Sequence, residues 1–225
     1  MKESLSRWLP PLLLAALYVL ACVGYTRLSG DPLGIGLGWN LVLAALPLVF
    51  GRLALHCSHA LPAAVCWLFW LLLLPNAFYF VTDLLHTPAG MEWLESNATG
   101  QVTVQHSSEF THWLLLVILG GGMFFAWLLG CLALDCLTDM LRRRAGTAAA
   151  WAGAAVVCLA CGAGIYIGRF LRLNSWDVFR PALLLQKLAA AVHPDALRLA
   201  LLFGGTALFA YAVYRALVRL THRSE

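Results

Sequence analysis

FTHWLLLVILGGGMFFAWLLGCLALDCL, residues Phe110–Leu137, is an apolar stretch in which Asp135 is the single Asp, Glu, Lys or Arg residue. A helix that crosses the hydrocarbon core of a bilayer needs about 20 apolar residues. The stretch is therefore long enough to span a membrane. It predicts an integral membrane protein rather than a soluble domain.

The composition of the whole chain indicates the same class. Its 225 residues are 61% hydrophobic and only 12% charged, and the mean hydropathy is +0.79. Such values are far from those of a soluble domain and leave no room for a separate catalytic domain. We predict an all-α transmembrane helix bundle, one domain over residues 1–225, with six spans at about 8–26, 34–55, 61–85, 110–137, 148–168 and 197–217. The first run also resembles a signal peptide, but multispan proteins normally retain their first helix, so we expect it to remain.

Lys and Arg indicate how the spans are oriented, since cytoplasmic loops of membrane proteins are enriched in them. Arg142–Arg144 follow the fourth span, whereas no Lys or Arg lies between His86 and His112. With six spans, these charges predict cytoplasmic N- and C-termini and an outward loop over residues 87–109. The net charge of +4 is spread over short loops, which indicates membrane topology and not nucleic-acid binding.

One loop departs from this rule. Basic residues lie between the fifth and sixth spans, on the side that should contain few of them: Arg169, Arg172, Arg180, Lys187 and Arg198. In the same loop, Pro181–Leu197 is apolar but too short and too interrupted for a span, which predicts a short interfacial or re-entrant helix. The misplaced positive charge calls for a functional reason.

Polar side chains follow Pro75 near the outer end of the third span, in LLLLPNAFYFVTDLLH. Proline lacks a backbone donor and loosens the helix there. The spacing of Asn76, Tyr79, Asp83 and His86 predicts that they lie along one face of an α-helix. A carboxylate near lipid is costly without a partner, so Asp83 either pairs with a cation or lies at the interface, where water hydrates it.

A second polar segment, GRFLRLNSWDVFRP, follows the fifth span. Arg169 and Arg172 are three residues apart and share a helical face. The alternative for this segment is structural: Asp177 favours a helix N-terminus, and Trp176 anchors the chain at the interface. The candidate ligand-binding residues of the two segments are Asn76, Tyr79, Asp83, Arg169, Arg172, Asn174, Trp176 and Asp177.

The exits of the third and fifth spans face the same side when six spans alternate across the membrane. Asp83 is therefore predicted to pair with Arg169 or Arg172 through charge-assisted, bidentate bonds. Two arginines and one carboxylate leave a positive surplus that suits a phosphate or carboxylate headgroup. The alternative is an ion pair that only fixes helix orientation. Within the second and fourth spans, Asn40 and Asp135 also need partners.

A metal site is a further alternative for the same region. Asp83 and His86 offer two ligand types on one helical face, and His106 and His112 lie in or near the outward loop. Their spacing matches no established motif. We therefore favour no metal and expect no cofactor.

Three segments match a known pattern in their order and spacing: WNLVLAALP at Trp39–Pro47, LPNAFYFVTDLLH at Leu74–His86 and GRFLRLNSWDVFRP at Gly168–Pro181. In these segments the chain resembles a family of predicted bacterial membrane proteins, catalogued as domain of unknown function 1361. The family commonly has a second proline where this chain has Phe78, so the backbone bend is expected to be gentler here. The resemblance implies a multi-pass protein of the bacterial plasma membrane and no established activity.

These observations predict a membrane protein whose outward polar pocket binds an anionic envelope component or lipid headgroup, with transport or modification as a further step. Two other classes remain open. One is a metal-dependent or acid-base enzyme acting on a lipid-borne substrate, and the other is a structural or accessory subunit of an envelope complex. The expected partners are the lipid bilayer and an anionic lipid or envelope precursor.

Overall fold

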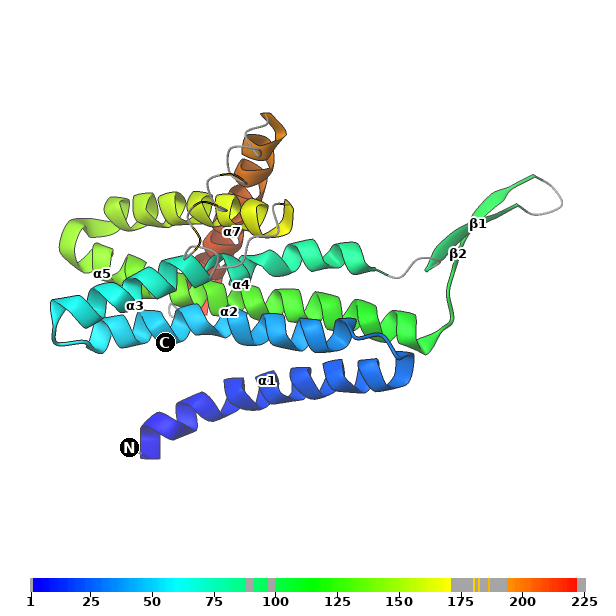
Figure 1. Cartoon of the computed structure of the whole chain (residues 1–225), viewed down its shortest axis with the longest axis horizontal. Helices are drawn as coiled ribbons and strands as arrows, with labels where there is room; N and C mark the ends of the chain where they lie inside the picture. Colours follow the sequence, from blue (N-terminus) through cyan, green and yellow to red (C-terminus); the bar gives the residue numbers. More distant parts are fainter. Residues whose placement is uncertain are drawn as a thin grey trace. The chain divides into compact units, whose positions relative to one another are not determined.

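The described part of the chain is almost entirely helical. The computed structural model describes residues 2–87, 91–96, 100–170, 180, 182, 186 and 194–221, with side chains from residue 11 onward. The helices labelled in Figure 1 are α1 (Lys2–Ser29), α2 (Leu33–His56), α3 (Ala60–Leu73), α4 (Pro75–Tyr79), α5 (Phe110–Phe170) and α7 (Pro194–Thr221). A 3₁₀-helix, η1 (Phe80–His86), continues α4.

Length and composition make these helices candidate membrane spans. Within the described residues, five segments are long and apolar enough to cross a bilayer: Pro11–Ser29, Leu33–His56, Ala60–His86, Phe110–Phe170 and Pro194–Thr221. On α1, the side chains of Leu12, Leu17 and Leu20 are each more than half exposed. Such an apolar outer surface suits lipid and not water. The predicted multi-pass helical membrane fold is confirmed.

The helix α5 accounts for two of the six predicted spans. At Gly146 its backbone has φ 87° and ψ 179°, which breaks the α-helical geometry. Glycine adopts this positive φ without the steric cost that a Cβ atom brings. Figure 1 shows α5 folding back on itself at this bend. The first arm extends beyond Leu137, its predicted end, so that Arg142–Arg144 belong to its last turns.

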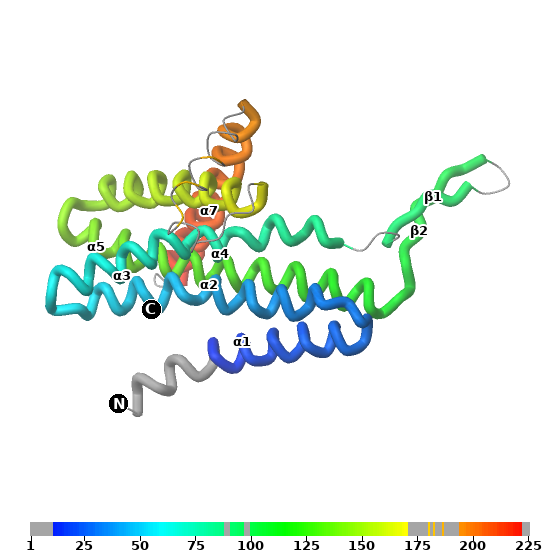
Figure 2. Tube along the Cα trace, in the orientation of Figure 1, coloured from blue at the N-terminus to red at the C-terminus, as the bar shows by residue number. Residues whose placement is uncertain are grey.

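A short polar turn joins α1 to α2, as Figure 2 traces. Gly30 has φ 75° there. The Ser29 hydroxyl donates to the carbonyl oxygen of Tyr25 at 2.8 Å and accepts from the N–H of Asp31 at 3.1 Å. The Asp31 carboxylate accepts from the N–H of Leu33 at 2.9 Å. These bonds satisfy backbone groups that helix ends leave unpaired.

Pro75 interrupts the third predicted span, as expected of a residue without a backbone N–H. α3 ends at Leu73 and α4 begins at Pro75. In a continuous α-helix, the N–H of Ala77 would donate to the carbonyl oxygen of Leu73. Here it donates to the carbonyl oxygen of Leu74 at 3.1 Å, which leaves the carbonyl oxygen of Leu73 without this bond. The side chain of Asn76 donates to that oxygen instead, at 2.9 Å. Asn76 therefore stabilises the break in the helical hydrogen-bond pattern between α3 and α4.

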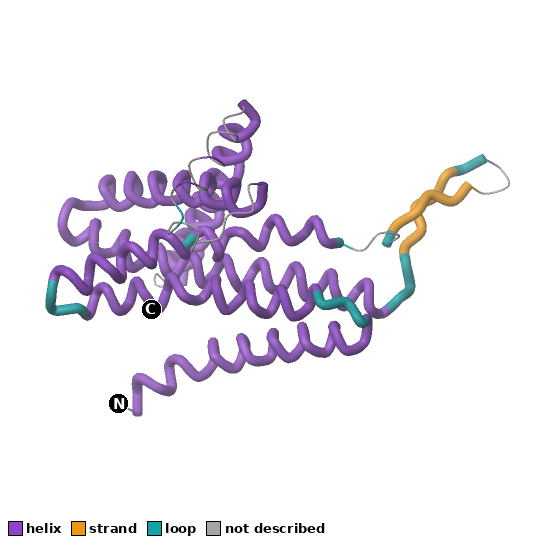
Figure 3. The backbone as a smooth tube through the Cα atoms, viewed as in Figure 1, coloured by secondary structure: helices purple, strands orange, loops and turns teal. Residues whose placement is uncertain are grey.

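An antiparallel β-hairpin follows η1, where the sequence predicted only an outward acidic loop. Strands β1 (Glu92–Ser96) and β2 (Val102–His106), orange in Figure 3, pair from Glu92↔His106 to Ser96↔Val102. Gly100, with φ 80°, lies in the connection between the strands. β-Branched residues of β2 favour the extended backbone. Every residue of β1 is exposed, so the strand lacks the buried face that makes strands easy to predict.

The chain divides into two compact units, each with its own buried core. The first comprises Met1–Leu41 and Val81–Phe124, and the second comprises Val42–Phe80 and Phe125–Glu225. Buried residues of the first unit include Cys22, Tyr25, Leu37, Leu41, Leu115 and Leu119. Buried residues of the second include Trp70, Phe78, Phe80, Leu134, Ile165 and Tyr211. The predicted helix over Pro181–Leu197 lies mostly outside the described residues, and α7 begins at Pro194.

Candidate functional site

Asp83 of η1 lies in the first unit, and its side chain is buried, with the residue only 3% exposed. Its Oδ2 atom accepts a hydrogen bond from Nδ2 of Asn40 in α2 at 2.9 Å. A buried carboxylate needs such a donor, because removal from water without one is costly. Asn40 thereby gains a partner in the third predicted span.

Tyr79 and Arg169 come together in the second unit. Nη1 of Arg169 is 3.3 Å from the hydroxyl oxygen of Tyr79, and the guanidinium carbon is 6.0 Å from the centre of the tyrosine ring. Both the hydroxyl and the ring face attract the guanidinium group, which this contact orients at the end of α5. The contact links residues from two of the three segments that carried the family resemblance.

The predicted polar stripe does not lie on one regular α-helix. Asn76 and Tyr79 belong to α4, whereas Asp83 and His86 belong to η1, which has fewer residues per turn. The other predicted ligand-binding residues lie outside the described part of the chain: Arg172, Asn174, Trp176 and Asp177. The pairing of Asp83 with Arg169 or Arg172 stays a prediction.

The histidines proposed for a metal site contact other groups. Within the first unit their contacts are as follows: His86 with the carbonyl oxygen of Asp83 at 3.1 Å, His106 with the carboxylate of Glu92 at 3.5 Å, and His112 with the carboxylate of Glu109 at 3.3 Å. Across the described residues, no group of three His, Cys, Asp or Glu side chains is arranged to hold a metal ion.

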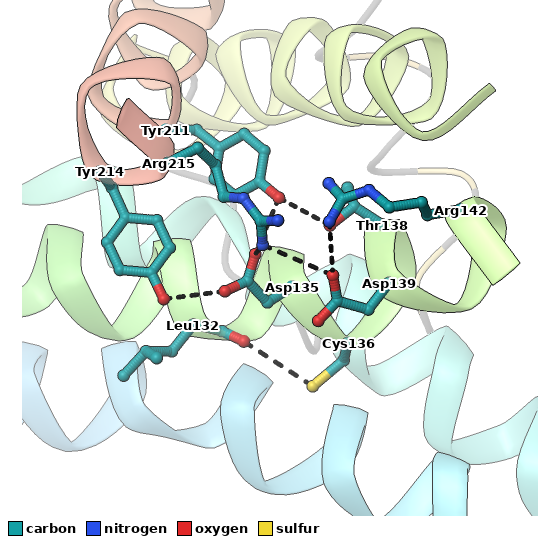
Figure 4. Close-up of polar contacts among 9 residues, drawn as sticks. All are labelled: Leu132, Asp135, Cys136, Thr138, Asp139, Arg142, Tyr211, Tyr214 and Arg215. Carbon is teal, nitrogen blue, oxygen red and sulfur yellow. Dashed lines mark hydrogen bonds and ion pairs between the residues drawn. The ribbon is translucent and has the colours of Figure 1, made fainter. Parts of the chain in front are cut away.

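A second polar cluster lies between α5 and α7 in the second unit, and Figure 4 shows it. Arg215 donates from Nη1 to Oδ1 of Asp135 at 2.7 Å, and their side chains are only 11% and 15% exposed. Tyr211 donates to the same oxygen at 2.8 Å, and Tyr214 donates to Oδ2 at 2.8 Å. Because the Tyr211 hydroxyl donates to Asp135, its oxygen accepts from Thr138 at 2.6 Å. Asp135 thus gains the partners that its position in a span requires.

Asp139 extends the cluster by one helical turn. It accepts from Nη1 of Arg142 at 3.3 Å and from Nη1 of Arg215 at 3.4 Å. Arg215 therefore bridges the two carboxylates of α5. The bridge holds α7 against α5 through charge-assisted bonds.

A pocket of about 380 Å³ opens beside this cluster in the second unit. Its lining comes from α2 and α5 and consists of Arg52, Leu55, Asp135, Cys136, Asp139, Met140, Arg143 and Arg144. The volume is within the range of small-ligand sites. Arginine is the most frequent residue of the lining, which contains three arginines and two aspartates.

The spacing of polar residues in the sequence indicated this cluster, although a hydropathy profile does not show such spacing. Asp135 and Asp139 are four residues apart, as are Tyr211 and Arg215, so each pair lies on one helical face. Six alternating spans also place the end of the fourth span and the end of the sixth on the same side. Partner choice between them depends on helix rotation, which the sequence pattern leaves open.

Comparison with known proteins places most of the chain in one family. A family model described as protein of unknown function (DUF1361) matches residues 39–210. The matched range includes all three segments that carried the resemblance, from Trp39–Pro47 to Gly168–Pro181. No curated protein and no solved structure matches the chain significantly.

Proposed function

Since the chain belongs to the DUF1361 family of proteins of unknown function, and is a multi-pass membrane protein, we propose that it binds an anionic envelope component in the bacterial plasma membrane. The ligand class is a phosphate- or carboxylate-bearing lipid headgroup or envelope precursor. Arg169 is the principal anion-binding residue. It lies in the last turn of α5, at the end of the helix that the charge pattern predicts to be on the outward side of the membrane.

The contact between Arg169 and Tyr79 supports this proposal most directly. The hydroxyl oxygen of Tyr79 accepts from the guanidinium group at 3.3 Å, so this contact helps to orient Arg169. A guanidinium group offers a planar fork of donors that matches phosphate and carboxylate oxygens. An oriented arginine at a predicted membrane surface is therefore suited to an anionic headgroup.

The charge pattern of the chain gives independent support. Arg169 is one of the basic residues that the orientation rule disfavours on the outward side. The family-like segments also supply one polar contact in each unit, namely Asn40 with Asp83 in the first and Tyr79 with Arg169 in the second. Residues that pair across helices hold the neighbouring groups in place for a ligand.

Native mass spectrometry of the purified protein with mixed anionic and zwitterionic lipids tests the proposal. We expect the wild-type protein to retain phosphatidylglycerol over phosphatidylcholine, and Arg169→Gln to weaken that preference. Arg169→Lys should restore it only in part, because lysine keeps the charge but lacks the bidentate fork. Arg219→Gln removes one exposed charge from the last turn of α7 and serves as the matched control.

Two results would contradict the proposal. One is equal retention of both lipids by the wild-type protein, and the other is an equal effect of Arg169→Gln and Arg219→Gln. Either result would favour the structural alternative, in which the polar contacts only fix the helices and the protein is an accessory subunit.

A further inference from the structure

We propose a second anion-binding site, for a phosphate group, in the pocket lined by Arg52, Arg143 and Arg144. The site goes beyond the function proposed for Arg169. Arg143 and Arg144 precede the Gly146 bend of α5, whereas Arg169 ends the arm that follows it. That arm corresponds to roughly 35 Å of helix at 1.5 Å per residue, so the two sites are separate.

The three arginines carry charge that the described structure does not neutralise. Among the residues that the structure describes, their guanidinium groups make no ion pair and no hydrogen bond. All three line one pocket, although Arg52 comes from α2 and the other two from α5. Like charges gathered from two helices repel one another, and an anion bound between them would relieve that repulsion.

The two carboxylates of the lining do not offset this charge. Asp135 is bound by Arg215 and by two tyrosine hydroxyls, and Asp139 is bound by Arg142 and Arg215. Each carboxylate therefore already has a cationic partner outside the pocket lining. The charge that remains for a ligand is that of the three arginines.

The chemistry of these groups selects phosphate. Arginine binds phosphate oxygens through paired, charge-assisted hydrogen bonds, and several arginines together suit a group that carries more than one charged oxygen. A pocket of about 380 Å³ accommodates a phosphate with a small attached headgroup. The source of that phosphate is either a phospholipid headgroup or a soluble phosphate compound, since the pocket lies at the end predicted to be cytoplasmic.

The test uses the full-length protein with Arg169→Gln, so that the first proposed site makes no contribution. Retention of phosphatidylglycerol against phosphatidylcholine is measured by native mass spectrometry, and binding of inorganic phosphate by calorimetry. We expect Arg52→Gln or Arg143→Gln to weaken either the retention of phosphatidylglycerol or the affinity for inorganic phosphate by about tenfold or more. This is the usual effect of losing a hydrogen bond to a charged group. Arg219→Gln, an exposed charge outside the lining, should leave both unchanged.

The two measurements separate the two sources. Loss of lipid preference without any phosphate binding identifies a phospholipid headgroup, whereas loss of phosphate binding identifies a soluble ligand. The proposal is wrong if the starting protein shows neither lipid preference nor phosphate binding, or if Arg219→Gln weakens binding as much as Arg52→Gln. In that case the arginines serve only to orient the helices in the membrane. Failure of the Arg169 site would leave these results unaffected.

Discussion

At the scale of single residues, Asp135 shows how the fold accommodates a charge inside a predicted span. The side chains of Asp135 and Arg215 are only 15% and 11% exposed, so their ion pair is mostly buried. The pair of Asp195 with Arg198 has the same residue types, but its side chains are 59% and 80% exposed. Breaking a buried pair costs about 3 to 5 kcal/mol, and breaking an exposed pair about 1 or less. We therefore expect Asp135→Ala to lower the melting temperature in detergent clearly, and Asp195→Ala to change it little. Equal shifts in melting temperature would show that Asp135 is hydrated and that its ion pair with Arg215 does not stabilise the fold.

At the scale of secondary-structure elements, α5 and α7 approach each other closely at Gly204. A Cβ atom on Gly204 would lie 2.8 Å from Cα of Leu159, whereas one on Gly205 would meet nothing within 4 Å. Gly204→Leu should therefore force the helices apart and destabilise the protein by about 1 to 3 kcal/mol. Gly205→Leu, on the same helix, is the matched control and should be tolerated. Thermal unfolding in detergent measures both, and equal stability of the two variants would contradict this helix contact.

At the scale of the whole molecule, the arrangement of spans predicts which loops face each side. The β-hairpin lies between the third and fourth spans, and the Gly146 bend lies between the fourth and fifth, so the two should be on opposite sides. We expect single cysteines at Ser96 and Thr147, in a protein without its native cysteines, to react with an impermeant thiol reagent from opposite sides. Ser96 should react from outside, because its loop lacks Lys and Arg. Reaction of both from one side would rule out six alternating spans.

The sequence by itself determined the class of the protein and showed where its long apolar helices lie. Hydropathy is a local property, so the length of each apolar run was enough to predict a membrane helix. The position of Pro75 likewise predicted the break between α3 and α4, because the missing backbone N–H affects only the neighbouring turn of helix. The family segments were recognisable for the same reason, since they are short runs of sequence. The β-hairpin was not predicted, because its strands have no buried face.

Only the tertiary structure decided which polar groups meet. Asn40 with Asp83, Tyr79 with Arg169, and Asp135 with Arg215 join residues that are distant in the chain. The sequence indicated that Asn40 and Asp135 need partners, because unpaired polar groups are costly near lipid. It did not indicate which partners, since that depends on how each helix is rotated and which helices are neighbours. The pocket of Arg52, Arg143 and Arg144 exists for this reason as well, because its walls come from two helices that pack together only in the folded protein.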